Sequence, residues 1–229
     1  MKQIVVLTGA GISAESGIKT FRDSNGLWEE HRIEDVATPQ AWQRNPKLVT
    51  EFYNQRRKQV MEAKPNEAHL ALVELEKHYS VVVITQNVDD LHERAGSKHI
   101  IHLHGEILKM RSEEDPTMIY RANEWEIKYE RTNEHGHRLR PHIVWFGEMV
   151  PKMDDAIFQT MKADIFLVIG TSLEVYPAAS LIDYTSQPCK KYIVDPKARE
   201  LNHIYNLTVI QNTAGKGVTE LVNKLIKDV

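Results

Sequence analysis

Three short runs of aliphatic and β-branched residues punctuate the chain, and small or polar residues follow each of them directly. The runs occupy residues 4–7, 81–84 and 165–169. Continuous apolar runs of this length predict parallel strands that are buried on both faces. Further strands are expected at 100–103, 192–194 and 207–210, and amphipathic helices lie between several of them, with a last one near 218–226. The alternation predicts an α/β fold with a doubly wound parallel sheet.

Two stretches do not fit that sheet and predict a small inserted module. Residues 46–61 and 66–78 have the apolar spacing of helices. The charged segment 109–140 forms a second such insert. In it, Trp125, Ile127 and Tyr129 alternate with charged residues, which is the pattern of a half-buried strand. His135-Gly136 is expected to turn the chain back through 138–140. We therefore expect one domain over 1–229. Its large part covers about 1–25, 80–108 and 145–229, and its small module covers about 30–78 and 109–141.

Composition narrows the class of protein. The chain has 229 residues, 41% hydrophobic and 27% charged, with 29 basic against 32 acidic side chains. This balance argues against a nucleic-acid partner, which needs an excess of positive charge. No stretch reaches the roughly 18 apolar residues of a membrane span, and the start lacks a signal-peptide core. A single cysteine, Cys189, excludes an internal disulfide and favours a cytoplasmic location. The oligomeric state stays open.

The first strand ends in a glycine-rich turn. Residues 9–14 match the pattern GxGxxA, in which small residues let a backbone approach a pyrophosphate at a helix N-terminus. A tight turn without a ligand is the alternative. A dehydrogenase would next need a strand ending in an acidic residue about 20 positions later, to hold ribose hydroxyls. Residues 20–28 instead form a polar loop with aromatic residues, so the sequence does not match a hydride-transfer enzyme.

Polar residues also follow the other predicted strands. Asn87 and Asp89 could hold hydroxyls or a water molecule, or they could cap the next helix. His102 and His104 share one face of a strand because side chains alternate with period 2, and a purely structural role is the alternative for either. Residues 170–172, Gly-Thr-Ser, fit a phosphate site or a plain loop.

Taken together, these segments closely resemble the sirtuins, which are NAD-dependent protein-lysine deacylases. The resemblance rests on GAGISAESGI and TFR (9–22), TQNVDDLHERAG (85–96), HLHG (102–105), PHIVWFGE (141–148) and GTSLEV (170–175). It covers nearly the whole chain in the family's order. It implies a Rossmann-like large domain, a small inserted module, and NAD bound in the cleft between them.

The resemblance also implies residue roles. It assigns catalysis to His104 as the general base, with Asn87 and Asp89, and an imidazole suits that task because its ordinary pKa of about 6.5 leaves it neutral near pH 7. The implied NAD contacts are Gly9, Ala10, Gly11, Glu15, Thr20, Phe21, Arg22, Trp28, Gln86, Asn87, Asp89, His104, Gly170, Thr171, Ser172, Asp195 and Ala214.

The implied reaction transfers the acyl group of a protein lysine to ADP-ribose and releases nicotinamide. Its products are free lysine, nicotinamide and O-acyl-ADP-ribose. The substrate peptide is expected to pair as an added strand with Val144, Trp145, Phe146, Gly147 and Glu148. Two alternatives remain: transfer of ADP-ribose to a protein side chain, and a non-catalytic module that binds NAD or acyl-lysine.

Tyr53 and Arg56 lie three residues apart on one predicted helix face. By composition alone they are a buried tyrosine beside a solvated arginine. Within the sirtuins, however, this pair resembles the mark of the class III branch, which binds acidic acyl groups. A guanidinium binds a carboxylate through two hydrogen bonds, so we expect desuccinylase and demalonylase activity besides deacetylase activity.

The chain departs from the family at the structural zinc site. Most relatives carry two cysteine pairs in the small module, whereas residues 109–141 contain no cysteine. His135 and His137 alone make a poor zinc site, so we expect no zinc. We expect Trp125, Ile127 and Tyr129, helped by residues 118–120, to form a small apolar core in place of the metal.

Overall fold

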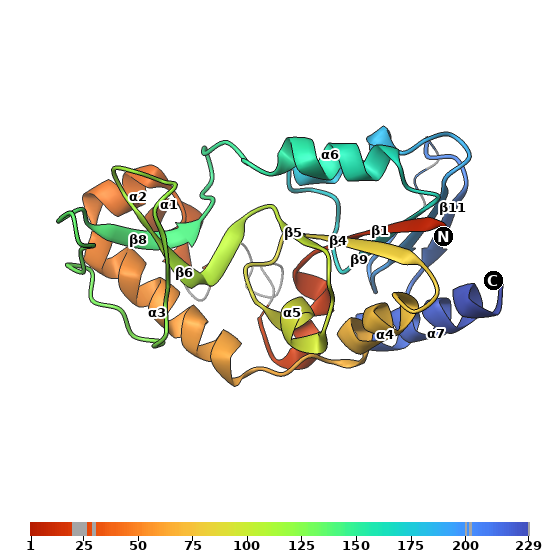
Figure 1. Cartoon of the computed structure of the whole chain (residues 1–229), viewed down its shortest axis with the longest axis horizontal. Coiled ribbons are helices and arrows are strands. Elements are labelled where there is room, and N and C mark those ends of the chain that lie inside the picture. Colours follow the sequence, from red (N-terminus) through yellow and green to blue (C-terminus); the bar gives the residue numbers. More distant parts are fainter. Residues whose placement is uncertain (20–26, 29–30, 200, 202, 229) are drawn as a thin grey trace.

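The structure is a computed structural model, and it describes residues 1–19, 27–28, 31–199, 201 and 203–228. It has two lobes, which Figure 1 shows side by side: a larger one around a parallel sheet, where both termini lie, and a smaller one around the helices α1–α3. The strand β6 runs between them. None of the described helices is long and apolar enough to cross a bilayer.

The larger lobe contains a six-stranded parallel sheet in the order β11-β10-β9-β1-β4-β5. Its strands are β1 (Gln3–Thr8), β4 (Ser80–Thr85), β5 (Ile100–His102), β9 (Ile165–Ile169), β10 (Lys190–Val194) and β11 (Leu207–Ile210). Along the chain the strands are added outward from β1 on one side and then, after β9, on the other. This is the doubly wound order, and it confirms the predicted fold class.

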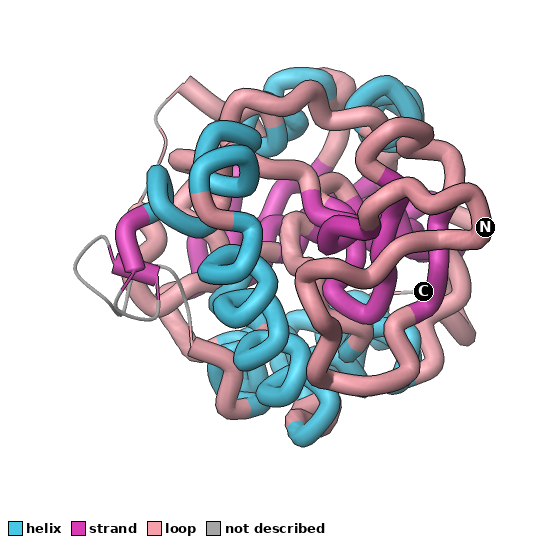
Figure 2. Tube along the Cα trace, turned by 90° about the vertical axis from the view of Figure 1, so that its left-hand side faces the viewer, coloured by secondary structure: helices cyan, strands magenta, loops and turns pink. Residues whose placement is uncertain are grey.

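Side chains of the central strands alternate between two apolar layers. Ile4 and Val6 of β1 pack with the helices α4 (Glu67–Leu75) and α7 (Ala214–Lys227). Val5 and Leu7 pack on the other face, under α6 (Met153–Met161) and the 3₁₀ helix η4 (Ala178–Tyr184). Figure 2 shows the strands in the middle of the molecule with helices around them. Burial on both faces explains why β1 and β4 carry polar residues only at their ends.

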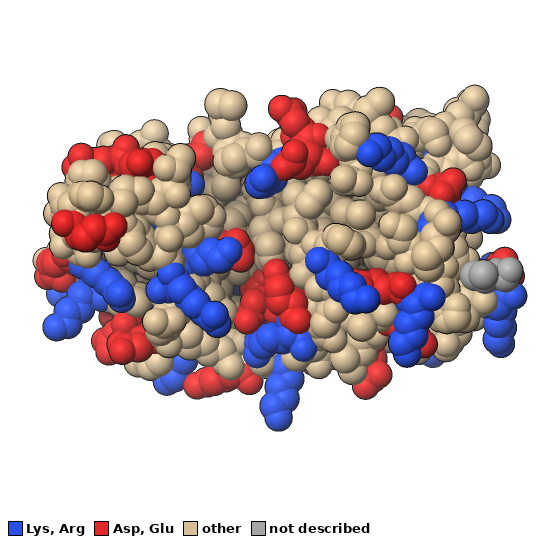
Figure 3. Space-filling view, in the orientation of Figure 1, with Lys and Arg blue, Asp and Glu red and all other residues tan. Residues whose placement is uncertain are grey.

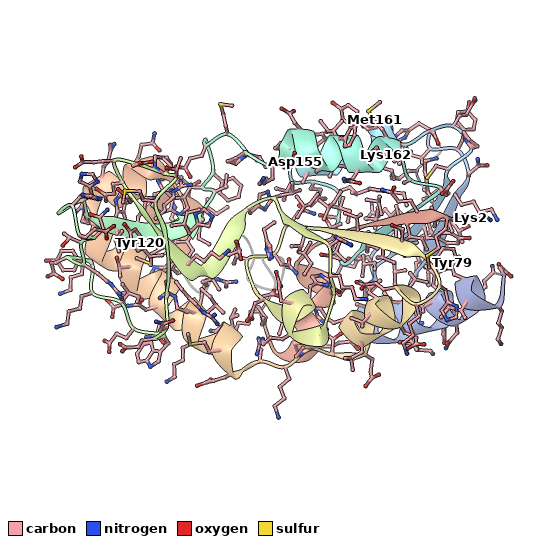
Figure 4. All side chains as sticks on the ribbon, in the orientation of Figure 1. Lys2, Tyr79, Tyr120, Asp155, Met161 and Lys162 are labelled. Atoms are coloured by element: carbon pink, nitrogen blue, oxygen red, sulfur yellow. The ribbon has the colours of Figure 1, made fainter. Side chains whose placement is uncertain are left out.

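One hydrogen bond joins the end of α7 to the start of β4. Tyr79, labelled in Figure 4, directly precedes β4, and its hydroxyl donates to the carbonyl of Leu225 at 2.8 Å.

The surface carries charges of both signs. On the face that Figure 3 shows, basic and acidic side chains are interspersed.

The smaller lobe combines helices with a three-stranded antiparallel sheet. Its elements are β2 (Leu27–Trp28), β3 (His31–Arg32), α1 (Ile33–Val36), α2 (Pro39–Arg44), α3 (Pro46–Glu62), β6 (Gly105–Ser112), β7 (Ile119–Arg121) and β8 (Leu139–Ile143). Asn45 caps α3 by accepting a hydrogen bond from the backbone N–H of Leu48 at 3.1 Å, and Pro46 occupies the first turn. The sheet order is β7-β6-β8.

The lobes divide the chain differently from the predicted ranges. The helix α4 falls within 30–78, the range expected for the small module, but its Ala68, Leu72 and Leu75 pack on the large sheet beside α7. The strand β6 already pairs with β8 from Gly105, so the small sheet begins before residue 109. Hydrophobic spacing identifies the buried face of a helix, but it does not say which sheet that face covers.

The predicted strand at 125–129 is wrong. Burial alternates as expected, with Ile127 fully buried, but the backbone pairs with side chains of α3. Asn54 donates to the carbonyl of Ile127 at 2.9 Å and accepts from its N–H at 3.0 Å, while Arg57 donates to the carbonyl of Trp125 at 2.8 Å. The expected reversal is confirmed: Thr132 pairs with Arg138, and the chain returns through β8.

The small apolar core also differs from the prediction. It consists of Met110, Ala122, Ile127 and Leu139, with Tyr120 packed against it (Figure 4). Trp125, Met118 and Tyr129 are only half-buried, and Ile119 is 46% exposed. Lys58 lies over the ring of Trp125, 5.2 Å from its centroid. Of the residues expected to replace the metal, therefore, only Ile127 and Tyr120 take part.

Candidate active site

Two glycine-rich loops meet where the sheet changes direction. The N–H of Gly9 donates to Ile169 at 2.9 Å, and the N–H of Gly11 donates to Gly170 at 2.8 Å. A side chain at Gly11 would place its Cβ 2.6 Å from the Cα of Gly170, and Gly170 itself has a φ of +64°. Only glycine fits so close a contact. The loops after β1 and β9 therefore form one joint surface at the topological switch point, where dinucleotides bind in such sheets.

A buried polar network lies directly behind this junction. The side-chain amide of Asn87 donates to the carbonyl of Gly9 at 3.1 Å and to the hydroxyl of Ser13 at 3.2 Å. Ser13 in turn donates to Asp89 at 3.0 Å, and the other oxygen of Asp89 accepts the N–H of Leu91 at 3.1 Å. Asp89 thus takes part in the network and also bonds the first residue of α5 (Leu91–Ala95), whose N-cap is the next residue, Asp90. Its expected contact with hydroxyl groups of a ligand stays a prediction.

Asp89 is a buried carboxyl group whose charged neighbours include His102 and Asp90. Burial raises its pKa, while the hydrogen bonds from Leu91 and Ser13 and the charge of His102 lower it in part. These interactions link three consecutive parts of the site: the loop after β1, the loop after β4 and the histidines after β5.

His104 is oriented by the backbone of the neighbouring loop. Its Nδ1 lies 3.0 Å from the carbonyl oxygen of Gln86, which can only accept, so Nδ1 carries the proton and Nε2 keeps its lone pair. Burial lowers the pKa of His104, and the hydrogen bond to Gln86 opposes this only in part. A half-buried imidazole that is neutral at pH 7 with a free Nε2 lone pair is equipped to act as a general base.

The remaining predicted NAD contacts lie along the same edge of the sheet. Gln86 donates to the hydroxyl of Thr171 at 3.4 Å, which joins the loops after β4 and β9, and Ser172 is exposed beside it. Asp195 follows β10 and accepts the N–H of Lys197 at 2.8 Å. Thr20, Phe21 and Arg22 lie outside the described residues, as does the side chain of Trp28.

Glu15, which belongs to the glycine-rich turn after β1, contacts the first turn of α7. Its carboxylate accepts the N–H of Gly215 at 2.6 Å, next to Ala214. These residues lie beside a pocket of about 440 Å³ that Glu15, Glu67, Gly215, Lys216, Thr219 and Glu220 line. The structure thus brings Glu15 and Ala214 together, although they are far apart in the sequence.

Tyr53 and Arg56 lie on α3 in different surroundings. Tyr53 is fully buried, and its hydroxyl accepts a hydrogen bond from the indole N–H of Trp145 at 3.0 Å. Burial also raises the pKa of Tyr53, so that it stays a neutral phenol. Arg56 lines a pocket of about 370 Å³, together with His31, Leu48, Glu51, Phe52 and Gln55. Tyr53 is not among the residues that line this pocket.

The segment 144–148 is held firmly by the rest of the chain. The N–H of Val144 donates to His104 and that of Phe146 donates to Ala37, both at 3.0 Å. The N–H of Trp145 donates to the carboxylate of Glu148 at 2.8 Å. Phe146 is 49% exposed and Gly147 is also exposed, whereas Trp145 is buried. If a peptide pairs with this segment, its hydrogen bonds would therefore involve the N–H of Gly147 and carbonyl oxygens of residues 144–148.

Sequence reasoning missed the role of Ser13, which lies inside the GxGxxA turn and joins Asn87 to Asp89. No signal in the sequence could have found this role, because Ser13 is separated from Asn87 and Asp89 by 74 and 76 residues. The sequence also gave no sign that Trp145 would donate to Tyr53, since the two are 92 residues apart.

No zinc is expected in the small module, and the test is direct. His135 and His137 are 5.8 Å apart between ring centroids, and each lies near a glutamate, Glu134 or Glu114. Within the described residues, no group of three potential metal-ligating side chains occurs between 109 and 141. Chelator-washed protein should retain less than about 0.1 zinc per chain by elemental analysis and an unchanged melting temperature; one zinc per chain would contradict the prediction.

A parallel sheet in doubly wound order, with a glycine junction at its switch point and polar groups along its carboxyl edge, defines a Rossmann-like nucleotide-binding protein.

Comparison with known proteins makes the assignment specific. Residues 9–177 match the Sir2 family model. An NAD-dependent protein deacylase of Helicobacter pylori is 53% identical over 99% of both chains, and one of Bacteroides thetaiotaomicron is 52% identical over 99% of both. A solved complex of a Sir2 homologue with NAD has a TM-score of 0.90 at 40% identity and covers 99% of this chain and 90% of its own.

A second solved structure is a Sir2 complex with a deacetylated p53 peptide and 3'-O-acetyl-ADP-ribose. It has a TM-score of 0.82 at 31% identity, over 99% of this chain and 93% of its own. This chain belongs to the Sir2 family, which confirms the resemblance that the motifs indicated.

Proposed function

We propose that this protein is an NAD-dependent protein-lysine deacylase that accepts acyl groups ending in a carboxylate, such as succinyl and malonyl, as well as acetyl. Membership of the Sir2 family and relatives named NAD-dependent protein deacylase support the general activity. The observation that carries the catalytic assignment is the geometry of His104, whose Nδ1–H is bound to Gln86 while Nε2 stays free to accept a proton.

The residues fit NAD as the cosubstrate. The glycine junction supplies a bare backbone surface at the switch point, and the network of Asn87, Ser13 and Asp89 supplies buried polar groups beside it. When bound, NAD would supply a glycosidic bond to nicotinamide, which would leave as the carbonyl oxygen of the acyl-lysine bonds to the same ribose carbon, so that the ADP-ribose unit becomes the acceptor of the acyl group. His104 would take a proton at Nε2 from a hydroxyl group and so make that oxygen a nucleophile.

Arg56 supports the preference for acidic acyl groups. Its pocket contains a guanidinium from Arg56 and an imidazole from His31, beside the apolar side chains of Leu48 and Phe52 and the carboxylate of Glu51. An aliphatic chain with a terminal carboxylate matches apolar walls that end at a guanidinium. Tyr53 would act differently, since it does not line this pocket and its hydroxyl accepts a hydrogen bond from the indole N–H of Trp145.

The test compares one peptide that carries succinyl-, malonyl- or acetyl-lysine, with and without NAD, and follows O-acyl-ADP-ribose by mass. We expect NAD-dependent release of all three acyl groups, fastest for the acidic ones. Transfer of ADP-ribose to the protein without loss of acyl groups would instead identify a mono-ADP-ribosyltransferase. NAD binding without any turnover would identify a binding module.

Arg56→Met should change selectivity more than activity. The variant keeps much of the side-chain length but loses the charge, so kcat/KM for succinyl-lysine should fall by about 10- to 100-fold, the usual worth of hydrogen bonds to a charged group. The value for acetyl-lysine should change by less than about 3-fold. Lys47→Met is the matched control, because Lys47 is an exposed cation in the first turn of the same helix. Equal losses for both substrates would contradict the assignment of Arg56.

Proteins bearing acyl-lysine are the proposed partners, and a cytoplasmic location is proposed with them. Cys189 is a buried free thiol, as expected in a reducing compartment. Binding of nucleic acid is not expected, given the charge balance of the chain.

A further inference from the structure

Three consecutive carbonyl groups follow β4, and each is paired with a group of the segment that starts at His102, the last residue of β5. The carbonyl of Gln86 accepts from His104 at 3.0 Å, that of Asn87 lies 3.3 Å from Nδ1 of His102, and that of Val88 accepts the N–H of Ile107 at 2.8 Å. Two histidine rings thus extend the contact between these two segments of the chain beyond the backbone pairing of β4 with β5. The ring of His102 bonds the carbonyl of Asn87, and the ring of His104 bonds the carbonyl of Gln86.

The second ring nitrogen distinguishes the two histidines. Nε2 of His102 lies 2.6 Å from the carboxylate of Glu93 on α5. Both nitrogens of His102 therefore face oxygens that can only accept, a carbonyl and a carboxylate, so satisfying both requires the doubly protonated imidazolium. The side chain of His102 is 10% exposed and that of Glu93 is 39% exposed, so Glu93 is the more open of the two to water.

Asn87 is the residue that this pair would control. Its side-chain amide bonds Gly9 and Ser13, and its N–H bonds the hydroxyl of Thr85 at 3.0 Å. The bond from His102 reaches the other backbone polar group of the same residue, its carbonyl. The peptide units on both sides of the Asn87 Cα are thus held, one through the carbonyl of Gln86 by His104 and the other by His102. A displacement of this backbone would move the side-chain amide off the glycine junction.

We propose that His102 and Glu93 are positioning residues for the deacylation reaction, because the imidazolium held by Glu93 anchors the carbonyl of Asn87 and thereby keeps its amide in place between Gly9 and Ser13. The inference rests on the deacylase activity proposed above. His102 touches neither substrate nor cosubstrate in this role, and His104 alone is the base.

Charged groups around His102 favour its cationic form. Burial lowers its pKa, but the hydrogen bond and charge of Glu93, with the charge of Glu106 and the carbonyl of Asn87, raise it above the ordinary 6.5 on balance. Among the described residues, Asp89 and His92 are further titratable groups that interact with it, and Lys109 pairs with Glu106 at 2.7 Å. The same cation lowers the pKa of Asp89 in part, which favours its ionised form.

The proposal predicts an alkaline limb in the pH profile of kcat. As pH rises through the raised pKa of His102, the ring loses a proton and can no longer donate to both Glu93 and Asn87. Activity should therefore fall on that side, whereas the loss of activity in acid comes from protonation of His104. Glu93→Gln keeps an acceptor for Nε2 but removes the negative charge, so it should move the alkaline limb to lower pH.

The experiment measures kcat and KM against pH for the wild type, Glu93→Gln and His102→Gln with one acyl-lysine peptide. His102→Gln, which keeps one amide donor but cannot titrate, should lower kcat by about 10- to 100-fold, leave KM for the peptide within about 3-fold, and abolish the alkaline limb. Asp155→Asn is the control, because Asp155 forms an ion pair with Lys152 in which both side chains are 60% exposed. Circular dichroism confirms that each variant folds.

The possible outcomes are distinct. An acid-shifted limb in Glu93→Gln together with its loss in His102→Gln supports the positioning role. Variants that only melt earlier, with unchanged kcat and an unchanged alkaline limb, overturn it and leave the pair a structural contact. If the wild type itself turns over no peptide, the proposed function fails first. If the wild type is active and the variants match it, only the present inference fails.

Discussion

Replacing His104 with alanine is expected to lower kcat/KM for every acyl-lysine peptide by about 10²- to 10⁴-fold, the usual contribution of a positioned general base. The loss follows from the geometry, because Nδ1 is committed to Gln86 and only Nε2 can take a proton. Steady-state rates on succinyl and acetyl peptides measure it. Both substrates should suffer alike, since the base acts on a hydroxyl group and not on the acyl terminus.

The pH profile gives this prediction an independent check. Burial lowers the pKa of His104 below 6.5. The neutral, active form therefore persists at pH 6.5 and is lost as the pH falls further, so the acid limb of kcat/KM should have an apparent pKa below 6.5. His99→Ala is the matched control, since His99 is exposed on the loop before β5, and it should leave rates unchanged. A His104→Ala protein that kept more than a tenth of the wild-type rate would contradict the assignment of the base.

Glu148→Ala is expected to give the largest loss of stability, about 3 kcal/mol, because it leaves two guanidinium groups together without a counter-charge. Glu148 accepts from Arg140 at 2.8 and 2.9 Å and from Arg111 at 3.2 and 3.3 Å, and the three side chains are only 11–20% exposed. Arg140 also stacks on Trp145, 3.5 Å from its ring centroid. Since Trp145 donates to Tyr53, loosening this cluster should reduce acyl-peptide turnover as well.

Denaturant unfolding of the wild type and the variant measures the effect. Asp155→Ala is the matched control: it removes an acidic partner from an exposed ion pair, which is worth about 1 kcal/mol at most. Glu148→Gln should fall between the two, because it keeps the side-chain volume and one acceptor oxygen. A Glu148→Ala protein no less stable than Asp155→Ala would show that the arginines find water or other partners.

The large sheet was predictable because its strands are buried on both faces. Continuous runs such as 4–7 and 165–169 have no other common explanation at that length, and all six predicted strands occur. The segment 125–129 was not predictable in the same way. Its alternation of Ile127 with charged neighbours records burial, while its backbone bonds Asn54 and Arg57 instead of another strand. Periodicity reports which side is buried, and it does not report the hydrogen-bond partner.

The site was predictable as a set of strand ends, since parallel strands present their carboxyl ends at one edge. Gly9, Asn87, His104 and Gly170 do meet there. The links between them were not predictable, because they depend on distances of a few tenths of an ångström between distant residues. Ser13 is the example: its identity gave no sign that it would join Asn87 to Asp89.

The chain leaves the small sheet at the end of β6 and returns to it at the start of β8, and these two ends lie side by side. Ser112 of β6 is paired with Leu139 of β8, and the next residue, Glu113, donates from its N–H to Arg138 at 3.0 Å. The pairs between residues 105–112 of β6 and 139–143 of β8 set the register of the two strands. This register places Gly105 beside Ile143 and thereby positions His104. Evolution could therefore lengthen, shorten or rebuild those parts of 114–137 that do not contact β6 or α3, including any metal-binding loop, without displacing His104.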